Sequence, residues 1–445
     1  MQSKFVSGSI PRHLLTMMFA SWVALASGML LSLADMYFLS RLNDVDVLAA
    51  IGFSGSIAMF PMSVGIGFSI AISVLVSQAL SRKGRAEASY IFSAILSIAL
   101  ALSLCVAAVL IFNLTLFLSV LGADGRVQEL ARSYLLITLC SAPLSVLLMA
   151  FASGLRSLAL AKASMWVSLL ATAINFILDP IFIEVLEMGI EGAAWATVVA
   201  RIIAVCVGLY YLIIKMQFVA WVSFSEVKQV FSTAKKIALP AVISNLFTPL
   251  GGVIVVSVAS GFGTEAMAGI AVVGSLSPIL FSVYFSLTGA AGPMIGQNIG
   301  AAKPERVGYI YRYGLLILSV YTLIIWLGLM LAHPFLLELF QLSGLAGDLL
   351  KLYCFVQVPL SFGLGCIALS NAIYNNLSKP HWSMWLNASR SSIVTYVFCH
   401  VGAFYYGVFG AVMASSLSFI VFGVLGVLFA ITLYRREYPE LKLLT

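Results

Sequence analysis

Charged residues are scarce in this chain of 445 residues: 9% are Asp, Glu, Lys or Arg, whereas 62% are hydrophobic. A soluble domain has about a quarter of its residues charged. This scarcity excludes an ordinary soluble protein and indicates a protein that crosses a membrane many times. The net charge of +7 does not indicate nucleic-acid binding, because the basic residues follow the membrane topology described below.

Motifs of enzymes and nucleotide-driven pumps are also missing. The apolar runs contain no serine in a GxSG context, and GxGD and HExxH are absent, so an intramembrane enzyme is disfavoured and no enzymatic activity is expected. No P-loop occurs, which argues against ATP as a driving force, and no cofactor is expected. The six cysteines lack CxxC spacing and all lie in apolar runs, as expected for small apolar packing residues.

Apolar runs long enough to span a bilayer dominate the chain. A spanning helix needs about 20 apolar residues, and the sequence predicts twelve such helices. Their approximate limits are 14–39, 50–80, 88–113, 130–154, 162–184, 192–214, 237–261, 267–297, 307–332, 349–374, 382–404 and 409–434. Of the 24 Lys and Arg residues, eighteen lie at the termini or in the even-numbered connections. By the positive-inside rule both termini are predicted to be cytoplasmic.

The second half of the sequence repeats the first at an offset of about 216–219 residues. The matched pairs include Gln78 and Gln297, Pro143 and Pro359, Trp166 and Trp382, Gly189 and Gly407, and Gly192 and Gly410. The repeat predicts an all-α membrane protein with two six-helix lobes related by a pseudo-two-fold axis along the membrane normal, an architecture of transporters. The predicted domains are an N-terminal lobe (1–214), a cytoplasmic linker (215–236) and a C-terminal lobe (237–445). Ser223 and Glu226 fit a capping box that would start an amphipathic helix in the linker.

Only two acidic residues, Asp35 and Asp179, lie well inside apolar runs. A charged carboxylate in hydrocarbon costs at least about 3 kcal/mol, so such a residue is expected to face a protein-lined or wet cavity and to handle a proton, an ion or a charged ligand. Asn175 and Thr172 share a helix face with Asp179. Pro180 has no N–H to donate to the carbonyl of Phe176, which adds a free oxygen acceptor.

Three oxygen-bearing residues are predicted at the same depth in the first lobe. Asp35 and Asp179 each lie five residues before the outer end of a span, and Thr197 lies five residues after the start of one. At 1.5 Å per residue, all three lie about 7–8 Å below the outer boundary. Two such carboxyl groups in an apolar environment do not both stay charged, which predicts a proton-carrying site, although the same oxygens also suit Na⁺. The second lobe lacks the pair, because Ile254 and about Tyr396 stand at the matching positions.

These residues resemble a known family. The stretches Asn175-Phe-Ile-Leu-Asp179-Pro180 and Gly189-Ile-Glu-Gly192-Ala-Ala-Trp-Ala-Thr197 are similar to those of multidrug and toxic compound extrusion (MATE) transporters. So are the stretches Gly296-Gln-Asn-Ile-Gly-Ala-Ala-Lys-Pro304 and Val76-Ser-Gln-Ala-Leu-Ser-Arg82. The resemblance covers essentially the whole chain, and the placement of the acids is similar to the DinF-like branch. In contrast to some relatives, the first span has no internal proline, because Pro11 precedes it.

The resemblance implies a secondary antiporter that exports amphipathic, often cationic, compounds through a V-shaped pair of lobes. It implies that Asp35, Asn175, Asp179 and Thr197 carry the coupling ion, which is H⁺ or Na⁺. Tyr134 matches a tyrosine near that site, and Tyr37 and Thr172 are further candidate neighbours. A monomer in the inner membrane is expected, with drug-like compounds, ions and lipid as its partners. A flippase for lipid-linked precursors is the alternative, disfavoured because only Arg201 and Arg390 lie inside spans as candidate cationic residues for its cavity.

Overall fold

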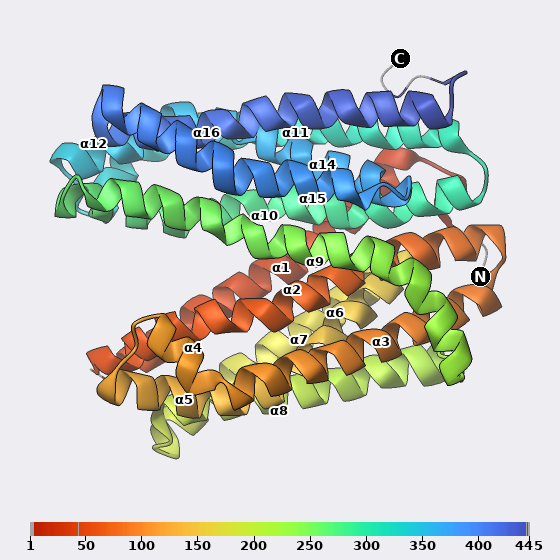
Figure 1. The fold of residues 1–445 in the computed structure, drawn as a ribbon, viewed down its shortest axis with the longest axis horizontal. Coiled ribbons are helices and arrows are strands. Elements are labelled where there is room, and N and C mark those ends of the chain that lie inside the picture. Colours follow the sequence, from red (N-terminus) through yellow and green to blue (C-terminus); the bar gives the residue numbers. More distant parts are fainter. Residues whose placement is uncertain (1–3, 43, 442, 444–445) are drawn as a thin grey trace. The chain divides into compact units, whose positions relative to one another are not determined.

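The computed structural model describes residues 4–42, 44–441 and 443, and this part of the chain is built of helices and short connections without a strand (Figure 1). The first half comprises η1 (Lys4–Val6), α1 (Ile10–Ser40), α2 (Val45–Arg82), α3 (Arg85–Phe112), α4 (Leu114–Val120), α5 (Gly125–Cys140), α6 (Ala142–Ser157), α7 (Ala161–Pro180), η2 (Ile181–Val185), α8 (Gly189–Leu209) and η3 (Tyr210–Lys215). The second half comprises α9 (Phe224–Ser260), α10 (Thr264–Gly300), α11 (Pro304–Leu339), α12 (Gly344–Leu352), η4 (Tyr353–Gln357), α13 (Val358–Leu360), α14 (Phe362–Asn376), α15 (Pro380–Ser389), η5 (Arg390–Val394) and α16 (Thr395–Glu437).

Twelve membrane spans account for these helices. Within the described residues, ten helical stretches are long and apolar enough to cross a membrane, and α5 with α6, bent by 46°, forms an eleventh. The last stretch, Pro380–Glu437, has 58 residues and leaves helical geometry at Tyr406 and Gly407. It is therefore two spans, and the predicted all-α fold with twelve transmembrane helices is confirmed.

The repeated glycines have a structural reason. Gly189 and Gly407 have φ angles of +56° and +60°, which glycine adopts at little cost, and each lies at the turn before the last span of its half. The glycine three residues later lies where helices touch. A Cβ on Gly192 would lie 2.6 Å from the Phe182 carbonyl oxygen, and one on Gly410 would lie 2.0 Å from that of Gly402. Both halves thus need a sharp turn and then a close backbone contact.

The chain forms two compact units. Unit 1 contains residues 1–4 and 19–242, and unit 2 contains residues 5–18 and 243–445. Two helices, α1 and α9, each contribute one part to either unit. The domain limits at 214 and 237 remain a prediction, and the predicted linker helix is not a separate element: residues 224–236 are the first turns of α9, which continues unbroken to Ser260. Only one arm of the capping box is seen, in which the Ser223 backbone N–H donates to Glu226 Oε2 (2.6 Å).

The segment before α9 is anchored within unit 1. Phe218 is fully buried and packs 5.6 Å from the ring of Phe92. The guanidinium of Arg85 donates to the Met216 carbonyl, and the Ala220 N–H donates to Ser93 Oγ (2.9 Å). This segment therefore fills the space beside the turn between α2 and α3.

The segment before α1 is anchored in the corresponding way within unit 2. Phe5 is buried, and its N–H donates to Gln297 Oε1 (3.0 Å). Asn298 Nδ2 donates to the Phe5 carbonyl (3.2 Å), and Arg306 Nη2 donates to the Gly8 carbonyl (3.0 Å). The turn between α10 and α11 thus holds a chain segment as the turn between α2 and α3 does, although different residues make the contacts in the two halves.

Packing elsewhere relies on small residues, and the outer surface is apolar. All six cysteines lie in the described part and are unpaired; Cys354, Cys366 and Cys399 are buried, in line with a packing role, whereas the other three are exposed. Large hydrophobic side chains are exposed along the helices, among them Phe19, Leu102, Trp166, Leu331 and Trp385. Such a surface suits hydrocarbon, because a helix satisfies its own backbone hydrogen bonds and needs no water along its length.

We expect Phe218→Ala to lower the free energy of unfolding by about 3–5 kcal/mol, because a fully buried ring leaves a cavity. Phe224→Ala is the matched control: Phe224 lies six residues later and is 85% exposed. Unfolding of the purified protein in detergent micelles measures the difference. Equal stability of the two variants would contradict a structural role for the Phe218 anchor.

Candidate functional site

Two acidic side chains from separate helices meet inside unit 1. Asn175 and Asp179 lie on one face of α7, because they are four residues apart, and both are buried (2% and 0% exposed). Asp35 reaches them from α1 and is half-buried. The Asn175 amide Nδ2 lies 3.3 Å from Asp35 Oδ1 and 3.3 Å from Asp179 Oδ2, and it donates to both. One amide therefore bridges the two carboxyl groups.

The carboxyl groups also interact directly. Asp35 and Asp179 are close enough to share a hydrogen bond when one of them is protonated. Within the described residues, Asp179 Oδ1 and Asn175 Oδ1 are buried and have no hydrogen-bond partner. Buried acceptors without a donor are costly. A proton on the pair supplies one of the missing donors, and a small cation would meet the same oxygens.

The local fold of α7 places Asp179 at this depth. Pro180 follows directly and lacks an N–H, so the regular helix ends there and continues as the π-helical turn η2. The first turn of α8 packs against η2, where Gly192 allows close contact with the Phe182 carbonyl. Asp179 is thus fixed between a proline-induced change of helix type and a close helix contact.

Two further groups lie around the acid pair. Tyr134 on α5 and Arg201 on α8 both interact electrostatically with Asp35. Arg201 is held in place because its Nη1 donates to Ser141 Oγ (2.6 Å) and to the Thr138 carbonyl (3.5 Å), at the bend between α5 and α6. Its closeness to Asp35 was not predicted, although a mid-span cation in the same lobe as two mid-span acids was a signal for it.

The other predicted residues make no hydrogen bond to the bridge within the described part of the chain. Thr172 Oγ1 donates to Ser27 Oγ (3.5 Å) and so adds a second contact between α7 and α1. Thr197 Oγ1 donates to the Ala193 carbonyl of its own helix (3.0 Å). Tyr37 is 60% exposed, and its ring packs edge-on against that of Phe38. The structure brings Asp35, Asn175 and Asp179 together, with Tyr134 acting on Asp35 electrostatically, and the roles of Thr172, Thr197 and Tyr37 stay predictions.

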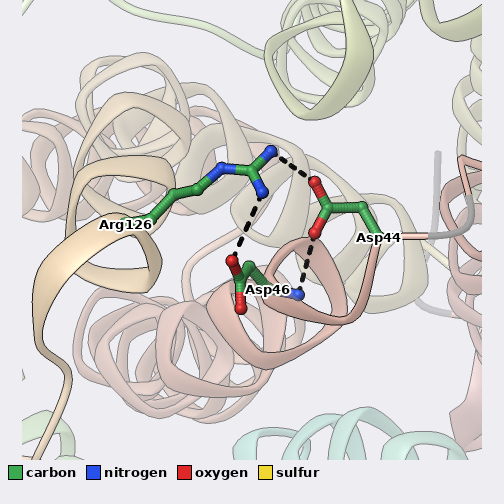
Figure 2. A network of polar contacts seen from close by, with 3 residues as sticks. All are labelled: Asp44, Asp46 and Arg126. Atoms are coloured by element: carbon green, nitrogen blue, oxygen red, sulfur yellow. Dashed lines mark hydrogen bonds and ion pairs between the residues drawn. The ribbon is translucent and has the colours of Figure 1, made fainter.

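Ion pairs connect the start of α5 to the start of α2. Figure 2 shows Arg126, at the start of α5, bonded to Asp44 Oδ2 (2.5 Å) and Asp46 Oδ2 (3.4 Å) at the start of α2. Asp44 also caps α2, because its Oδ1 accepts from the Asp46 N–H (3.0 Å). Exposed ion pairs contribute about 0–1 kcal/mol each. The two ion pairs therefore add little to the free energy of folding. They link the start of α5, which carries Tyr134, to the start of α2.

Unit 2 has no counterpart of the acid pair, since Ile254 and Tyr396 stand near the matching positions. Among the described residues, no group of three or more His, Cys, Asp or Glu side chains could hold a metal ion. The unpartnered buried oxygens of Asp179 and Asn175 make the site of unit 1 a candidate for a proton or an alkali cation.

The comparisons with known sequences point to transporters. A family model described as MatE matches residues 20–181 and again residues 240–401, so the same model fits both halves. The FAD transporter of Shewanella oneidensis is 27% identical over 94% of each chain. The probable multidrug resistance protein YpnP of Bacillus subtilis is 27% identical over 68% of each chain. The multidrug export protein MepA of Staphylococcus aureus is 24% identical over 65% of this chain and 64% of its own.

Solved structures share the fold. The Vibrio cholerae MATE transporter VcmN in the bent form has a TM-score of 0.90 and 24% identity, and covers 98% of this chain and 99% of its own. A MOP superfamily transporter from Pyrococcus furiosus also has a TM-score of 0.90, with 20% identity and coverage of 98% and 99%.

We expect Asn175→Ala to lower the free energy of unfolding by about 1–3 kcal/mol, because two buried carboxyl groups lose their common donor. Asn113→Ala is the control, since Asn113 is exposed and donates only to the Val109 carbonyl of its own helix. Thermal unfolding of both variants in detergent measures the effect. An equal loss of stability in Asn113→Ala and Asn175→Ala would contradict a contribution of the amide bridge to the free energy of unfolding.

Proposed function

Because this chain belongs to the MatE family of membrane transporters, we propose that it exports amphipathic drug-like compounds in exchange for protons carried by Asp35 and Asp179. The observation that carries this proposal is the buried amide bridge from Asn175 to both carboxyl groups. The bridge joins α1 to α7, so a change in its charge acts on the contact between two spans.

The chemistry of the pair supports a proton-dependent switch. With both carboxyl groups charged, one amide cannot offset two neighbouring negative charges in an apolar environment. A proton that enters the site neutralises one carboxyl group and lets it donate to the other, which draws α1 toward α7. Release of the proton restores the repulsion and loosens this contact. The pair therefore favours different arrangements of α1 in its two protonation states.

Antiport requires that the proton and the cargo favour different states of the protein. Each charge that moves through 100 mV supplies about 2.3 kcal/mol, so one or two protons can drive a substantial concentration gradient of cargo. Tyr134 and Arg201 act on Asp35 from α5 and α8 and tune its affinity for the proton. Thr172 and Thr197 remain candidate oxygen ligands for Na⁺, the alternative coupling ion.

A flavin nucleotide is the second candidate cargo. The relative described as a FAD transporter matches this chain over 94% of both lengths, whereas the multidrug export protein MepA matches about two thirds. A drug-like amphiphile and a flavin share an extended aromatic surface, but they differ in charge.

We expect Asp35→Asn to lower proton-driven transport of ethidium, a cationic amphipathic dye, at least tenfold, because the amide cannot bind and release a proton. Asp348→Asn is the control: Asp348 is an exposed acid in unit 2 that pairs with Lys351. Everted membrane vesicles with an imposed pH gradient measure the rate. Transport by Asp35→Asn at the wild-type rate would contradict this mechanism. Transport by the wild type that is driven by a Na⁺ gradient alone would identify Na⁺, and not the proton, as the coupling ion.

We also propose that the protein is a monomer of the inner membrane with both termini in the cytoplasm, because the basic residues concentrate in the connections on that side. A green fluorescent protein fused after Thr445 is expected to fluoresce, since it matures in the cytoplasm, and a periplasmic reporter such as alkaline phosphatase at the same position is expected to be inactive. The reverse pattern would contradict this topology.

A further inference from the structure

Among the described residues of unit 2, one cationic side chain is buried within the helices. Arg390 is 5% exposed and is the first residue of the π-helical segment η5, in the middle of a membrane span. Short π-helical segments are rare inside α-helices and occur often at functional sites. The position is therefore unusual both in its charge and in its backbone.

Arg390 has no polar partner among the described residues. Its Nε is buried without an acceptor, and neither an ion pair nor a hydrogen bond of its guanidinium group occurs in this part of the chain. Arg201 in unit 1 is the contrast, because it donates to Ser141 Oγ and to the Thr138 carbonyl. A structural arginine bonds to such oxygens, so Arg390 lacks the contacts that a structural role requires.

Aromatic rings surround this cation on one side. The guanidinium carbon lies 5.0 Å from the centre of the Phe419 ring. Phe419 is edge-on to Phe281 (6.5 Å between ring centres), and Phe281 stacks on Tyr284 (5.8 Å, planes 15° apart). We call these three rings the aromatic cluster. Phe281 and Tyr284 belong to α10, and Phe419 belongs to α16 and contacts the guanidinium group of Arg390.

A buried acceptor lies on the same helix face. Gln357 Nε2 donates to Ser416 Oγ (2.7 Å), whereas Gln357 Oε1 is buried without a partner among the described residues. Ser416 and Phe419 are three residues apart on α16 and so face the same way. Within unit 2, the unpaired Arg390 Nε therefore contacts α16 through Phe419, and the helix segment with the unpaired Gln357 Oε1 contacts α16 through Ser416.

We propose that Arg390 recognises the anionic group of one class of transported compound, an organic anion with a planar aromatic ring, such as a phosphate-bearing nucleotide. The guanidinium group binds phosphate or carboxylate oxygens through two parallel hydrogen bonds, and the apolar surroundings strengthen this pairing. Phe281 and Phe419, which are partly exposed, offer a surface against which the ring of the ligand packs, and the buried Tyr284 backs them. The inference rests on the transport function proposed above and adds an aromatic anion to the compounds carried.

The energetics agree with this assignment. An uncompensated cation inside a membrane protein is costly, and a bound anion removes that cost. Unit 1 has the opposite character, because its interior carries the acid pair.

Equilibrium binding tests the inference without any ion gradient. FAD and riboflavin are titrated by calorimetry into the purified wild-type protein and into the Arg390→Met, Arg390→Lys and Arg435→Met variants. Arg390→Met keeps most of the side-chain volume, and Arg435→Met removes an exposed cation from the end of α16. We expect Arg390→Met to weaken FAD binding at least tenfold, Arg390→Lys to weaken it less, and Arg435→Met to leave it unchanged. Riboflavin, which shares the ring but lacks the phosphates, is expected to bind more weakly and equally to all four proteins.

Thermal stability separates recognition from a structural role. We expect Arg390→Met to unfold at the wild-type temperature or above it, because the contact of Arg390 with Phe419 is its one ring contact and no hydrogen bond or ion pair among the described residues is lost. Equal FAD affinity of the wild type and Arg390→Met, or no FAD binding by the wild type, would overturn the inference. A lower unfolding temperature with unchanged FAD affinity would do the same and assign a structural role. Because the binding measurement involves no coupling ion, its failure would leave the Asp35 and Asp179 mechanism standing, and the reverse also holds.

Discussion

The amide of Asn175 bridges the half-buried carboxyl group of Asp35 and the buried one of Asp179, and so joins α1 to α7 in unit 1. Carboxyl groups in hydrocarbon are costly when charged, and two neighbouring charges cost more than one. Asn175 donates to both acids, while one oxygen on Asp179 and one on Asn175 itself remain without a donor in the described part of the chain. The site is thus stabilised in part and left incomplete in part, which is the condition for reversible binding of a proton or cation.

The two halves share a fold and differ in charge. Both have a glycine of positive φ before the last span and, three residues later, a glycine in close contact with a neighbouring backbone carbonyl. Both also hold a chain segment at the turn after their second long helix. These features are needed to form the spans and therefore recur. The charged groups inside the spans serve no such need: unit 1 has an acid pair with Arg201, and unit 2 has Arg390 beside an aromatic cluster. This difference suits a transporter in which one half handles the coupling ion and the other selects the cargo.

Departures from regular helix occur at the positions that carry these groups. Asp179 and Pro180 precede the π-helical turn η2, Gln357 ends η4, and Arg390 begins η5. A π-helical turn shifts the register of the residues that follow and frees backbone groups from the regular pattern. Asp179 and Arg390 therefore lie at the borders of π-helical turns, whereas Asp35 and Asn175 lie within regular helices.

The sequence alone determined the twelve spans, the repeat and the pairing of Asp35 with Asn175 and Asp179, because apolar length, helical periodicity and equal depth in the membrane follow from residue spacing. It did not determine that α9 starts at Phe224 without a separate linker helix, since a capping signal cannot show where a long helix ends. Nor could it bring Arg201 close to Asp35, or leave Arg390 without a hydrogen-bond partner among the described residues. These outcomes depend on which faces of separate helices meet, and only the tertiary structure decides the rotation and approach of each helix.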